Sequence, residues 1–432
     1  MSQYLQPIRD FAERYPLRAL VVILLVGMLP RLWMLPISGF SLDLEQHFHW
    51  GLCGVEQGVF GVYNCWPEVT HPPISPTMLT LSMGLLQATG GDVITFDGNA
   101  AASFMLKLPN LIFEIALICL VFVIVWKRYG AAWAMLVTAL LHWNLGWMIV
   151  TSWWGQNDAT YTTFMLITGY LLTRKRPRWM WLAYALAWLA KFQSIMFLPV
   201  LVVFTLRRHG LRALIEGLLI YAAAFAAGVL PFLLGSGKMA LNPFVGTVNL
   251  FPYITNGAFN MWFWVSGSSH LVLLDSLPFA AGLTYFQAGL IALSVGEAIL
   301  CLRVWLLPER DDEFLVLAAA NLSFFMLPTQ IQLRYLYPGL VFLALAMVRD
   351  WRLIALYIGL SITFMYNVFD IVDLSIGLLY YPSKLMPWSP TINALAVTGL
   401  YAAFMALFLR PLWAVRHEWR QRLLPQTATG SG

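Results

Sequence analysis

The sequence predicts an all-helical polytopic membrane protein, and three observations support this fold class. The chain of 432 residues is 60% hydrophobic and 11% charged, whereas charged residues make up about 25% of a typical soluble domain. Its mean hydropathy is +0.71. Long apolar runs recur along the chain and are separated by short basic segments. We therefore expect one integral membrane domain over residues 1–432 rather than several soluble domains.

The apolar runs define twelve expected spans. In chain order they cover residues 18–37, 103–126, 131–150, 158–173, 179–190, 192–206, 213–233, 282–302, 313–328, 336–348, 353–370 and 391–409. A straight span needs about 20 apolar residues. The fourth, fifth, sixth and tenth runs are shorter, and we expect their ends to extend into the polar loops. The first run lacks a small-residue cleavage site and should remain as a span.

Lys and Arg residues fall mainly on one side of this topology. With a cytoplasmic N-terminus, 20 of the 26 lie inside, as the positive-inside rule requires. The other six are Arg31, Lys107, Lys191, Lys238, Arg334 and Lys384. A further span over Pro72 to Gln87 would place Lys127 and Arg128 outside, so we expect a surface helix there. The net charge of +5 thus indicates topology and gives no reason to expect a nucleic acid partner.

Two expected outer loops are long, residues 38–102 and 234–281, whereas the inner connections are short. We therefore expect the chemistry on the outer face. The first loop contains Cys53 and Cys65, which would form a disulfide in an oxidising compartment; two free thiols are the alternative. The second loop is rich in aromatic residues and glycine, and it either lines a substrate groove or anchors the protein at the membrane interface.

Asp43 is the leading candidate for a catalytic base. It lies in Ser41-Leu-Asp-Leu-Glu-Gln-His-Phe-His-Trp50, directly after the first apolar run and close to Glu45, His47 and His49. A charge near hydrocarbon costs about 2.5 to 3.5 kcal/mol even on insertion scales, and such residues usually serve a function. On a helix, Asp43 and His47 share a face. The alternatives are a helix N-cap and a metal site of Asp43, His47 and His49, for which the spacing is irregular.

Two further polar segments are expected at the same face. His71 opens the sequence His71-Pro-Pro73 and either contacts a ligand phosphate or hydroxyl or faces solvent on a rigid turn. The segment Trp153-Trp-Gly-Gln-Asn-Asp158 joins the third and fourth runs. Helix capping would explain Asn157 or Asp158, but it does not explain Gln156 beside two tryptophans, so we favour function.

Lys191, Gln193 and Arg334 form the last group of candidates. Lys191 and Gln193 lie at the outer break between the fifth and sixth runs, and Arg334 lies at the outer end of the ninth. A Lys and an Arg that face one cavity suit the phosphate of an anionic lipid, because Arg offers a bidentate fork and Lys a point charge. The alternative is that both side chains extend to the lipid headgroups.

Taken in order, these motifs resemble those of the GT-C membrane glycosyltransferases. The shared features are an acidic residue after the first span, a Pro-Pro surface helix, Trp-Gly-Gln-x-Asp, Lys-x-Gln and Arg-Tyr-Leu-x-Pro. The resemblance covers about residues 18–345 and is nearest to bacterial mannosyltransferase-like proteins related to the second mannosyltransferase of GPI-anchor synthesis. It implies a GT-C-like catalytic module over 18–233, C-terminal transmembrane helices over 282–410 and a cytoplasmic tail over 411–432.

The resemblance also implies an activity. It is the inverting transfer of a hexose, with mannose favoured, from a polyprenyl-phosphate donor to a lipid-linked or glycan acceptor on the outer face. Asp43 matches the catalytic position. The residues expected to bind the donor phosphate or substrate are Lys191, Gln193, Arg334, Asp158, Gln156, His71, Glu45 and His47. The late motif departs from the family, because Gln332 and Leu333 stand where we expect His and Glu.

We expect no cofactor, and leave a divalent metal open. The expected location is a bacterial inner membrane, with membrane lipid around the chain and the site facing the periplasm. The alternatives are a solute transporter or lipid-carrier flippase, and a GT-C-like subunit without activity. Transporters often contain repeats and mid-membrane polar clusters. The sequence has no evident repeat, and Glu114 and Glu297 look isolated, which favours an enzyme.

Overall fold

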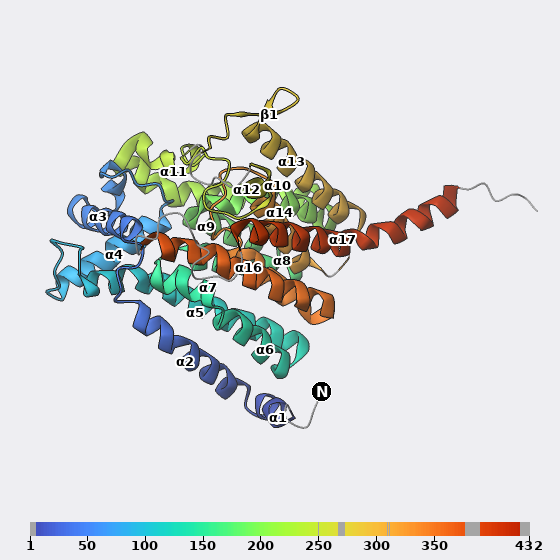
Figure 1. Cartoon of the computed structure of the whole chain (residues 1–432), viewed down its shortest axis with the longest axis horizontal. Coiled ribbons are helices and arrows are strands. Elements are labelled where there is room, and N and C mark those ends of the chain that lie inside the picture. The colour runs from blue at the N-terminus through green and yellow to red at the C-terminus, as the bar shows by residue number, and fades with distance from the viewer. Residues whose placement is uncertain are drawn as a thin grey trace, which may run out of the picture.

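The computed structural model is a bundle of helices, and it describes residues 6–248, 250–266, 273–308, 310, 312–375 and 389–423 (Figure 1). Its α-helices are α1 (Gln6–Arg14), α2 (Pro16–Met34), α3 (Ser41–Gln57), α4 (Ile74–Ala88), α5 (Ala100–Tyr129), α6 (Ala131–His142), α7 (Leu145–Met148), α8 (Asp158–Thr173), α9 (Pro177–Ala190), α10 (Leu198–Ser236), α11 (Asn242–Val245), α12 (Met261–Val265), α13 (Tyr285–Leu306), α14 (Glu313–Met326), α15 (Tyr337–Ala346), α16 (Trp351–Ser375) and α17 (Pro390–Leu423). Shorter helical turns are η1 (Val59–Asn64), η2 (Ile149–Trp153), η3 (Phe192–Phe197), η4 (Gly237–Leu241) and η5 (Met347–Arg349). Strands β1 (Pro278–Ala280) and β2 (Leu283–Thr284) pair antiparallel.

Within the described residues, six helices are long and apolar enough to cross a membrane. They are Pro16–Met34, Ala100–Tyr129, Phe192–Val245, Tyr285–Leu306, Trp351–Val372 and Pro390–Trp413. The pair formed by Ala131–His142 and Leu145–Trp153 is bent by 55° and counts as a seventh if it makes one span. These helices are compatible with an integral membrane protein, as the composition predicted.

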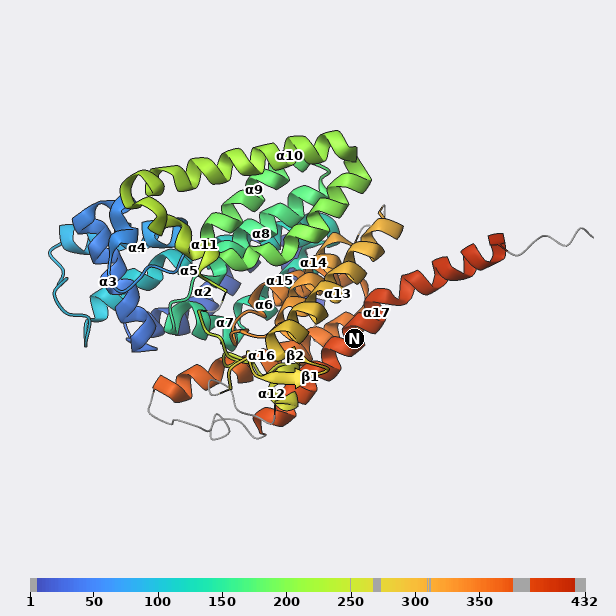
Figure 2. The same cartoon turned by 90° about the horizontal axis from the view of Figure 1, so that it is seen from above.

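The structure therefore supports the helical membrane class but a smaller number of long spans than the expected twelve. Each expected run does lie on helical chain, and the fourth run, 158–173, coincides with α8. The difference comes from length, because α8, α9, α14 and α15 each have fewer than 18 residues. The sixth and seventh runs share α10, which is interrupted at Gly210 by a φ of 80°; Figure 2 shows the long course of this helix along one side of the bundle.

A small helical unit covers one end of the bundle, where α3 and α4 pack against each other (Figure 1). Its own core includes Phe48, Trp50 and Met83. Cys53 at the end of α3 and Cys65 after η1 are joined in a disulfide, so this expectation is confirmed. The apolar stretch over Pro72 to Gln87 forms α4, which has 15 residues. Its length agrees with the expectation of a helix that does not span, and its position on a membrane surface remains a prediction.

One part of the second long loop packs against the helical bundle, and another part lines the cavity described below. Phe244 lies 5.0 Å from Phe225, ring centre to ring centre, and Trp262 donates a hydrogen bond of 2.8 Å to the carbonyl of Leu327. These aromatic side chains fasten the loop to the bundle. Thr247, Leu250 and Phe251 instead line the cavity. A substrate groove and anchoring at the membrane interface both remain predictions for this loop. Lys384 and the C-terminal residues 424–432 lie outside the described residues.

The interior contains a charged cluster that the sequence did not predict. Glu114 on α5 accepts hydrogen bonds from Arg31 on α2 and lies 3.7 Å from His142 Nδ1 at the end of α6. The three side chains are fully buried, with exposed fractions of 0%. Glu114 is thus not isolated, and that expectation is wrong: Arg31 and His142 are distant in sequence and become its partners only when three helices pack. Arg31 is therefore a structural cation, because its counter-charge lies within the bundle.

Lys107 is also accounted for by the fold. Its Nζ lies 3.3 Å from the carbonyl oxygen of Met34 and 3.2 Å from that of Leu35, at the C-terminal end of α2. The last carbonyls of a helix lack partners within the helix and carry a partial negative charge. Lys107 satisfies them. Of the other cations expected on the outer side, Lys238 is exposed on η4, which leaves Lys191 and Arg334 as the buried ones to be explained.

Candidate functional site

A distorted turn between α7 and α8 presents the polar residues of the Trp-Gly-Gln-x-Asp motif. Residues Ile149–Trp153 form a π-helical turn, a feature that is frequent at functional sites. Gly155 follows with a φ of 77°, and a Cβ atom there would lie 2.8 Å from Leu44 and 2.9 Å from Lys107. Glycine is required for both its conformation and its small size. The chain then turns sharply, and Asp158 begins α8.

Two donors from this turn hold the Asp43 carboxylate. Trp154 Nε1 and Gln156 Nε2 each donate a hydrogen bond of 2.8 Å to Asp43 Oδ2. Asp43 lies in the first turn of α3, whose N-cap residue is Phe40, so helix capping does not explain it. Both donors reach the same carboxylate oxygen, and the packed turn fixes the direction of the group.

Asp158 lies between two cations beneath this carboxylate. Lys191 Nζ is 2.8 Å from Asp158 Oδ1, and Arg334 Nε is 3.2 Å from Asp158 Oδ2. The side chains of Asp158, Lys191 and Arg334 are 0%, 2% and 8% exposed. Such burial excludes extension of either cation to the lipid headgroups. The Arg334 guanidinium also lies 4.5 Å from the centre of the Trp154 ring, so one tryptophan touches both the cation and Asp43.

The candidate residues converge on one cavity of about 170 Å³ at the end of the bundle that carries α3 and α4. It is lined by Asp43, Gln46, His47, Trp50, Thr70, His71, Pro72, Gln156, Lys191, Phe192, Gln193, Thr247, Leu250, Phe251, Gln330, Gln332, Arg334 and Tyr335. The lining therefore unites a carboxylate, two cations, two imidazoles and several amides. Asp158 is not part of this lining; it acts behind the wall by binding both cations.

His47, Trp50 and His71 form an aromatic wall of the cavity. Their ring centres are 5.3 to 5.5 Å apart. Burial lowers the pKa of His47 to about 4 and that of His71 well below its usual value. Each imidazole is neutral near pH 7 and offers one donor and one acceptor. This pairing suits hydroxyl groups better than phosphate, and the Nδ1 atoms of both rings are buried with no hydrogen-bond partner among the described residues.

The remaining predicted residues differ in position. Gln193 donates a hydrogen bond of 2.7 Å to the Tyr335 hydroxyl and lines the cavity. Glu45 is more than half exposed and lies 4.0 Å from His49, on the side of α3 away from His47. Glu45 is therefore not part of the cavity lining. The i, i+2 spacing accounts for this, since residues two apart on a helix do not share a face.

The structure does not bring Asp43, His47 and His49 together as metal ligands. His49 faces Glu45, whereas His47 lies against Trp50 and His71. Across the described part of the chain, no group of three or more His, Cys, Asp or Glu residues has the arrangement of a metal site. A metal thus has no identified position in this cavity.

Several lining residues were missed by sequence reasoning. Gln330 has a φ of 64° and donates a hydrogen bond of 2.8 Å to Asp275, which also accepts one from Thr329. Gln332 lines the cavity with its Oε1 buried and lacking a partner among the described residues. Trp50 completes the histidine wall. Gln332 could have been selected, since it lies two residues before Arg334 in the late motif, whereas no pattern in the sequence indicates Gln330.

The fold and site define a helical protein, compatible with insertion in a membrane, that has a charged cavity at one end. No family model matches the chain, and no curated protein matches its sequence. The chemistry of the cavity is therefore what indicates the function of the protein.

Proposed function

We propose that the protein is an inverting membrane glycosyltransferase. It would move a hexose, with mannose favoured, from a polyprenyl-phosphate donor to a lipid or glycan acceptor on the outer face. The observation that supports this best is the joint presence of Asp43, Lys191 and Arg334 in one cavity of about 170 Å³. A general base and two phosphate-binding cations are the groups that such a transfer needs.

In this mechanism, Asp43 accepts the proton of the acceptor hydroxyl as its oxygen attacks the anomeric carbon. The new C–O bond forms on the face opposite the bond to phosphate, which breaks with its electrons going to the phosphate oxygen. General-base catalysis of this kind contributes about 10² to 10⁴-fold. Trp154 and Gln156 hold Oδ2, so Oδ1 is the oxygen to which we assign the proton.

The leaving phosphate needs stabilisation of negative charge and no proton. Lys191 and Arg334 provide it electrostatically, and preorganised charges in a water-poor site are effective because little reorganisation is required. Asp158 keeps both cations in place through contacts of 2.8 and 3.2 Å. We therefore assign Asp158 a positioning role. The motif alone suggested that Asp158 contacts the substrate directly, and the positioning role replaces that assignment.

We assign sugar recognition to the aromatic wall of His47, Trp50 and His71 and to the side-chain amide of Gln332. The neutral His47 and His71 present one donor and one acceptor each, and Gln332 presents an acceptor that lacks a described partner. Hexose hydroxyls are both donors and acceptors, so they can satisfy these atoms. Trp50 offers an apolar surface to the C–H side of the ring. A buried polar atom without a partner is costly, which favours a polar ligand at this wall.

The test compares Asp43→Asn with the wild type in proteoliposomes that contain a panel of polyprenyl-phosphate sugars and a lipid extract. We expect transfer by the wild type and a loss of at least about 10²-fold in the variant, the lower range for a general base. Glu45→Gln is the matched control, since Glu45 lies two residues away and is exposed. Near-normal transfer by Asp43→Asn would remove the assignment of the base.

A transporter or lipid-carrier flippase is the second candidate. The observation in its favour is the buried cluster of Arg31, Glu114 and His142, since ionisable residues inside membrane bundles often mark transport pathways. Movement of a labelled polyprenyl-phosphate sugar across the bilayer without an acceptor, unaffected by Asp43→Asn, would favour this candidate. The inactive-subunit alternative predicts neither transfer nor movement, and Gln332 and Leu333 are the positions that motivate it.

A further inference from the structure

Asp275 is a buried carboxylate on the second long loop, and the proposed transfer does not use it. The residue is 3% exposed. Its Oδ2 accepts a hydrogen bond of 2.8 Å from Thr329 Oγ1 and another of 2.8 Å from Gln330 Nε2. Asp275 and Gln330 are 55 positions apart in the chain. A carboxylate is costly to bury unless its oxygens find partners, so these two donors account for its place in the interior.

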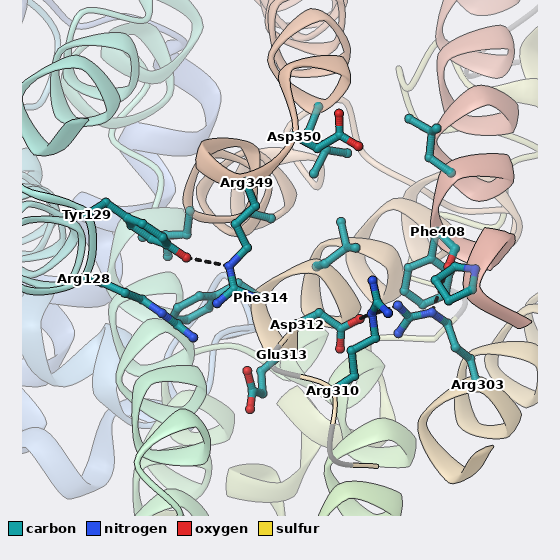
Figure 3. A pocket seen from close by; sticks show the side chains of 16 residues that line it. Arg128, Tyr129, Arg303, Arg310, Asp312, Glu313, Phe314, Arg349, Asp350 and Phe408 are labelled. Carbon is teal, nitrogen blue, oxygen red and sulfur yellow. Dashed lines mark hydrogen bonds and ion pairs between the residues drawn. The ribbon is translucent and has the colours of Figure 1, made fainter. Parts of the chain in front are cut away.

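The partners of Asp275 carry no charge, which distinguishes it from other buried acidic residues. Asp312 lines a cavity of about 340 Å³ where α5 ends and α14 begins; it binds Arg303 and lies 3.0 Å from Arg310 (Figure 3). Asp158 likewise binds two cations. Within the described part of the chain, Asp275 has no ion pair with Lys, Arg or His. Neutralising a buried cation is therefore not its task, and its hydrogen bonds indicate instead which groups it orients.

The backbone of Asp275 fastens two further segments to the same point. Its N–H donates a hydrogen bond of 3.0 Å to the carbonyl of Pro252. Its carbonyl accepts one of 2.9 Å from the N–H of Phe286, in the first turn of α13. The carbonyl of Tyr253, next to Pro252, accepts a hydrogen bond of 3.1 Å from the N–H of Gln330. Asp275 therefore joins the loop, the start of α13 and the segment that carries Gln330.

The segment that Asp275 holds leads directly into the late motif of the candidate site. Gln330 has a φ of 64°, a conformation that residues other than glycine rarely adopt and keep only where surrounding contacts fix it. Gln332 forms a β-bridge with Asn256 of the loop and lines the cavity. Arg334 follows two residues later and also lines the cavity. The contacts of Asp275 help to fix the turn at Gln330, so the positions of Gln332 and Arg334 depend on them.

The same segment forms the boundary between the charged cavity and an apolar groove of about 180 Å³. The groove is lined in part by Phe286, Leu290 and Phe324, and Gln330 lines both the groove and the cavity. Leu290 is 51% exposed on α13, one of the helices long enough to cross a membrane. The groove therefore reaches the outer side of the bundle. A ligand with its phosphate in the cavity and its hydrocarbon in the groove would pass Gln330 where the two regions meet.

We propose that Asp275 is a positioning residue of the candidate site. It fixes Thr329 and Gln330 at the boundary between the charged cavity and the apolar groove. Through this segment it holds Gln332 and Arg334 where the head of an amphiphilic phosphate ligand binds. Asp275 lines neither the cavity nor the groove, so it acts through these residues and not by contact with the ligand. The inference rests on the proposed function, because it takes a polyprenyl phosphate as the ligand.

The test measures the KM for the polyprenyl-phosphate donor in proteoliposomes that contain the full chain. A smaller folded fraction lowers the rate per total protein and leaves KM unchanged, so KM separates positioning from stability. We expect KM to rise about tenfold in Asp275→Ala, as for lost hydrogen bonds to a charged group. Asp275→Asn should restore KM to within about threefold of the wild type, because its amide oxygen can accept both hydrogen bonds. Asp97→Ala is the matched control, since Asp97 is exposed on the first long loop.

Native mass spectrometry with undecaprenyl phosphate distinguishes failure of this inference from failure of the proposed function. Wild-type binding without any transfer, weakened in Asp275→Ala and restored in Asp275→Asn, would support the positioning role and remove the transferase assignment. Transfer with an unchanged KM in Asp275→Ala, or an equal rise in Asp275→Asn or Asp97→Ala, would overturn the positioning role alone. Neither binding nor transfer by the wild type would overturn both. If Asp275→Ala does not fold, Thr329→Val removes one of the two donors and should raise KM in the same direction.

Discussion

Replacement of Asp158 by Asn should strongly destabilise the protein, because Asp158 is the shared counter-charge of two buried cations. Asp158 is 0% exposed and lies 2.8 Å from Lys191 and 3.2 Å from Arg334. Removing one partner of a buried ion pair costs about 3–5 kcal/mol, since it leaves an uncompensated charge in a poorly solvated site. That loss is a large fraction of the typical 5–15 kcal/mol of a folded domain. Unfolding in mixed micelles by denaturant titration measures it.

A second substitution separates the charge effect from other consequences of Asp158→Asn. Adding Lys191→Met removes one of the stranded charges, so the double variant should be more stable than the sum of the two single effects predicts. Glu216→Gln is the control, because it breaks exposed pairs with Arg178 and Arg212 and should change the free energy of unfolding little. A loss below about 1 kcal/mol for Asp158→Asn, or strict additivity in the double variant, would refute the reasoning.

Two more predictions follow from buried titratable groups. The pKa of His47 is about 4 in the folded protein and about 6.5 in an unfolded chain. Between these pH values the unfolded chain therefore binds more protons than the folded protein. The free energy of unfolding should be highest above pH 6.5 and should fall by up to about 3 kcal/mol as the pH drops towards 4. A pH titration of unfolding checks this, and an unchanged profile in His47→Asn would contradict it. Glu114→Gln should lower the free energy of unfolding by about 3–5 kcal/mol, because it leaves the buried Arg31 without its counter-charge. The rate of sugar transfer per folded molecule should not change. Loss of sugar transfer with an unchanged free energy of unfolding would contradict a structural role for Glu114.

The helices could largely be predicted from the sequence, because hydropathy is a local signal. The run 158–173 coincides with α8, and Pro72 to Gln87 corresponds to α4, Ile74–Ala88. The number of spans was less accessible. Short helices such as α9 and α14 differ from long spans in length, and the 55° bend lies at the break of two residues between α6 and α7. Apolar composition alone does not report these features.

The charged residues of the candidate site could be predicted from the sequence, whereas several uncharged lining residues and the contacts between the charged groups could not. Charge scarcity on the outer side selected Lys191 and Arg334, and the structure brings them to one cavity with Asp43. The pairing of both cations with Asp158 joins residues that are 33 and 176 positions apart in the chain. The same limit applies to Arg31 and Glu114, 83 positions apart. Such contacts depend on helix packing, which cannot be read from a single sequence.

The segment from Trp154 to Asp158 explains why the charged groups of the cavity behave as a unit. Trp154 donates to Asp43 and lies under the Arg334 guanidinium, Gln156 donates to Asp43, and Asp158 binds both Lys191 and Arg334. One five-residue turn therefore sets the distance between the proposed base and the proposed phosphate-binding cations. The π-helical turn and Gly155 determine where these side chains start. In a regular helix Gln156 would face away from Trp154 and Asp158, since residues two apart do not share a face, so the backbone distortion is what lets Trp154 and Gln156 donate to the same carboxylate oxygen.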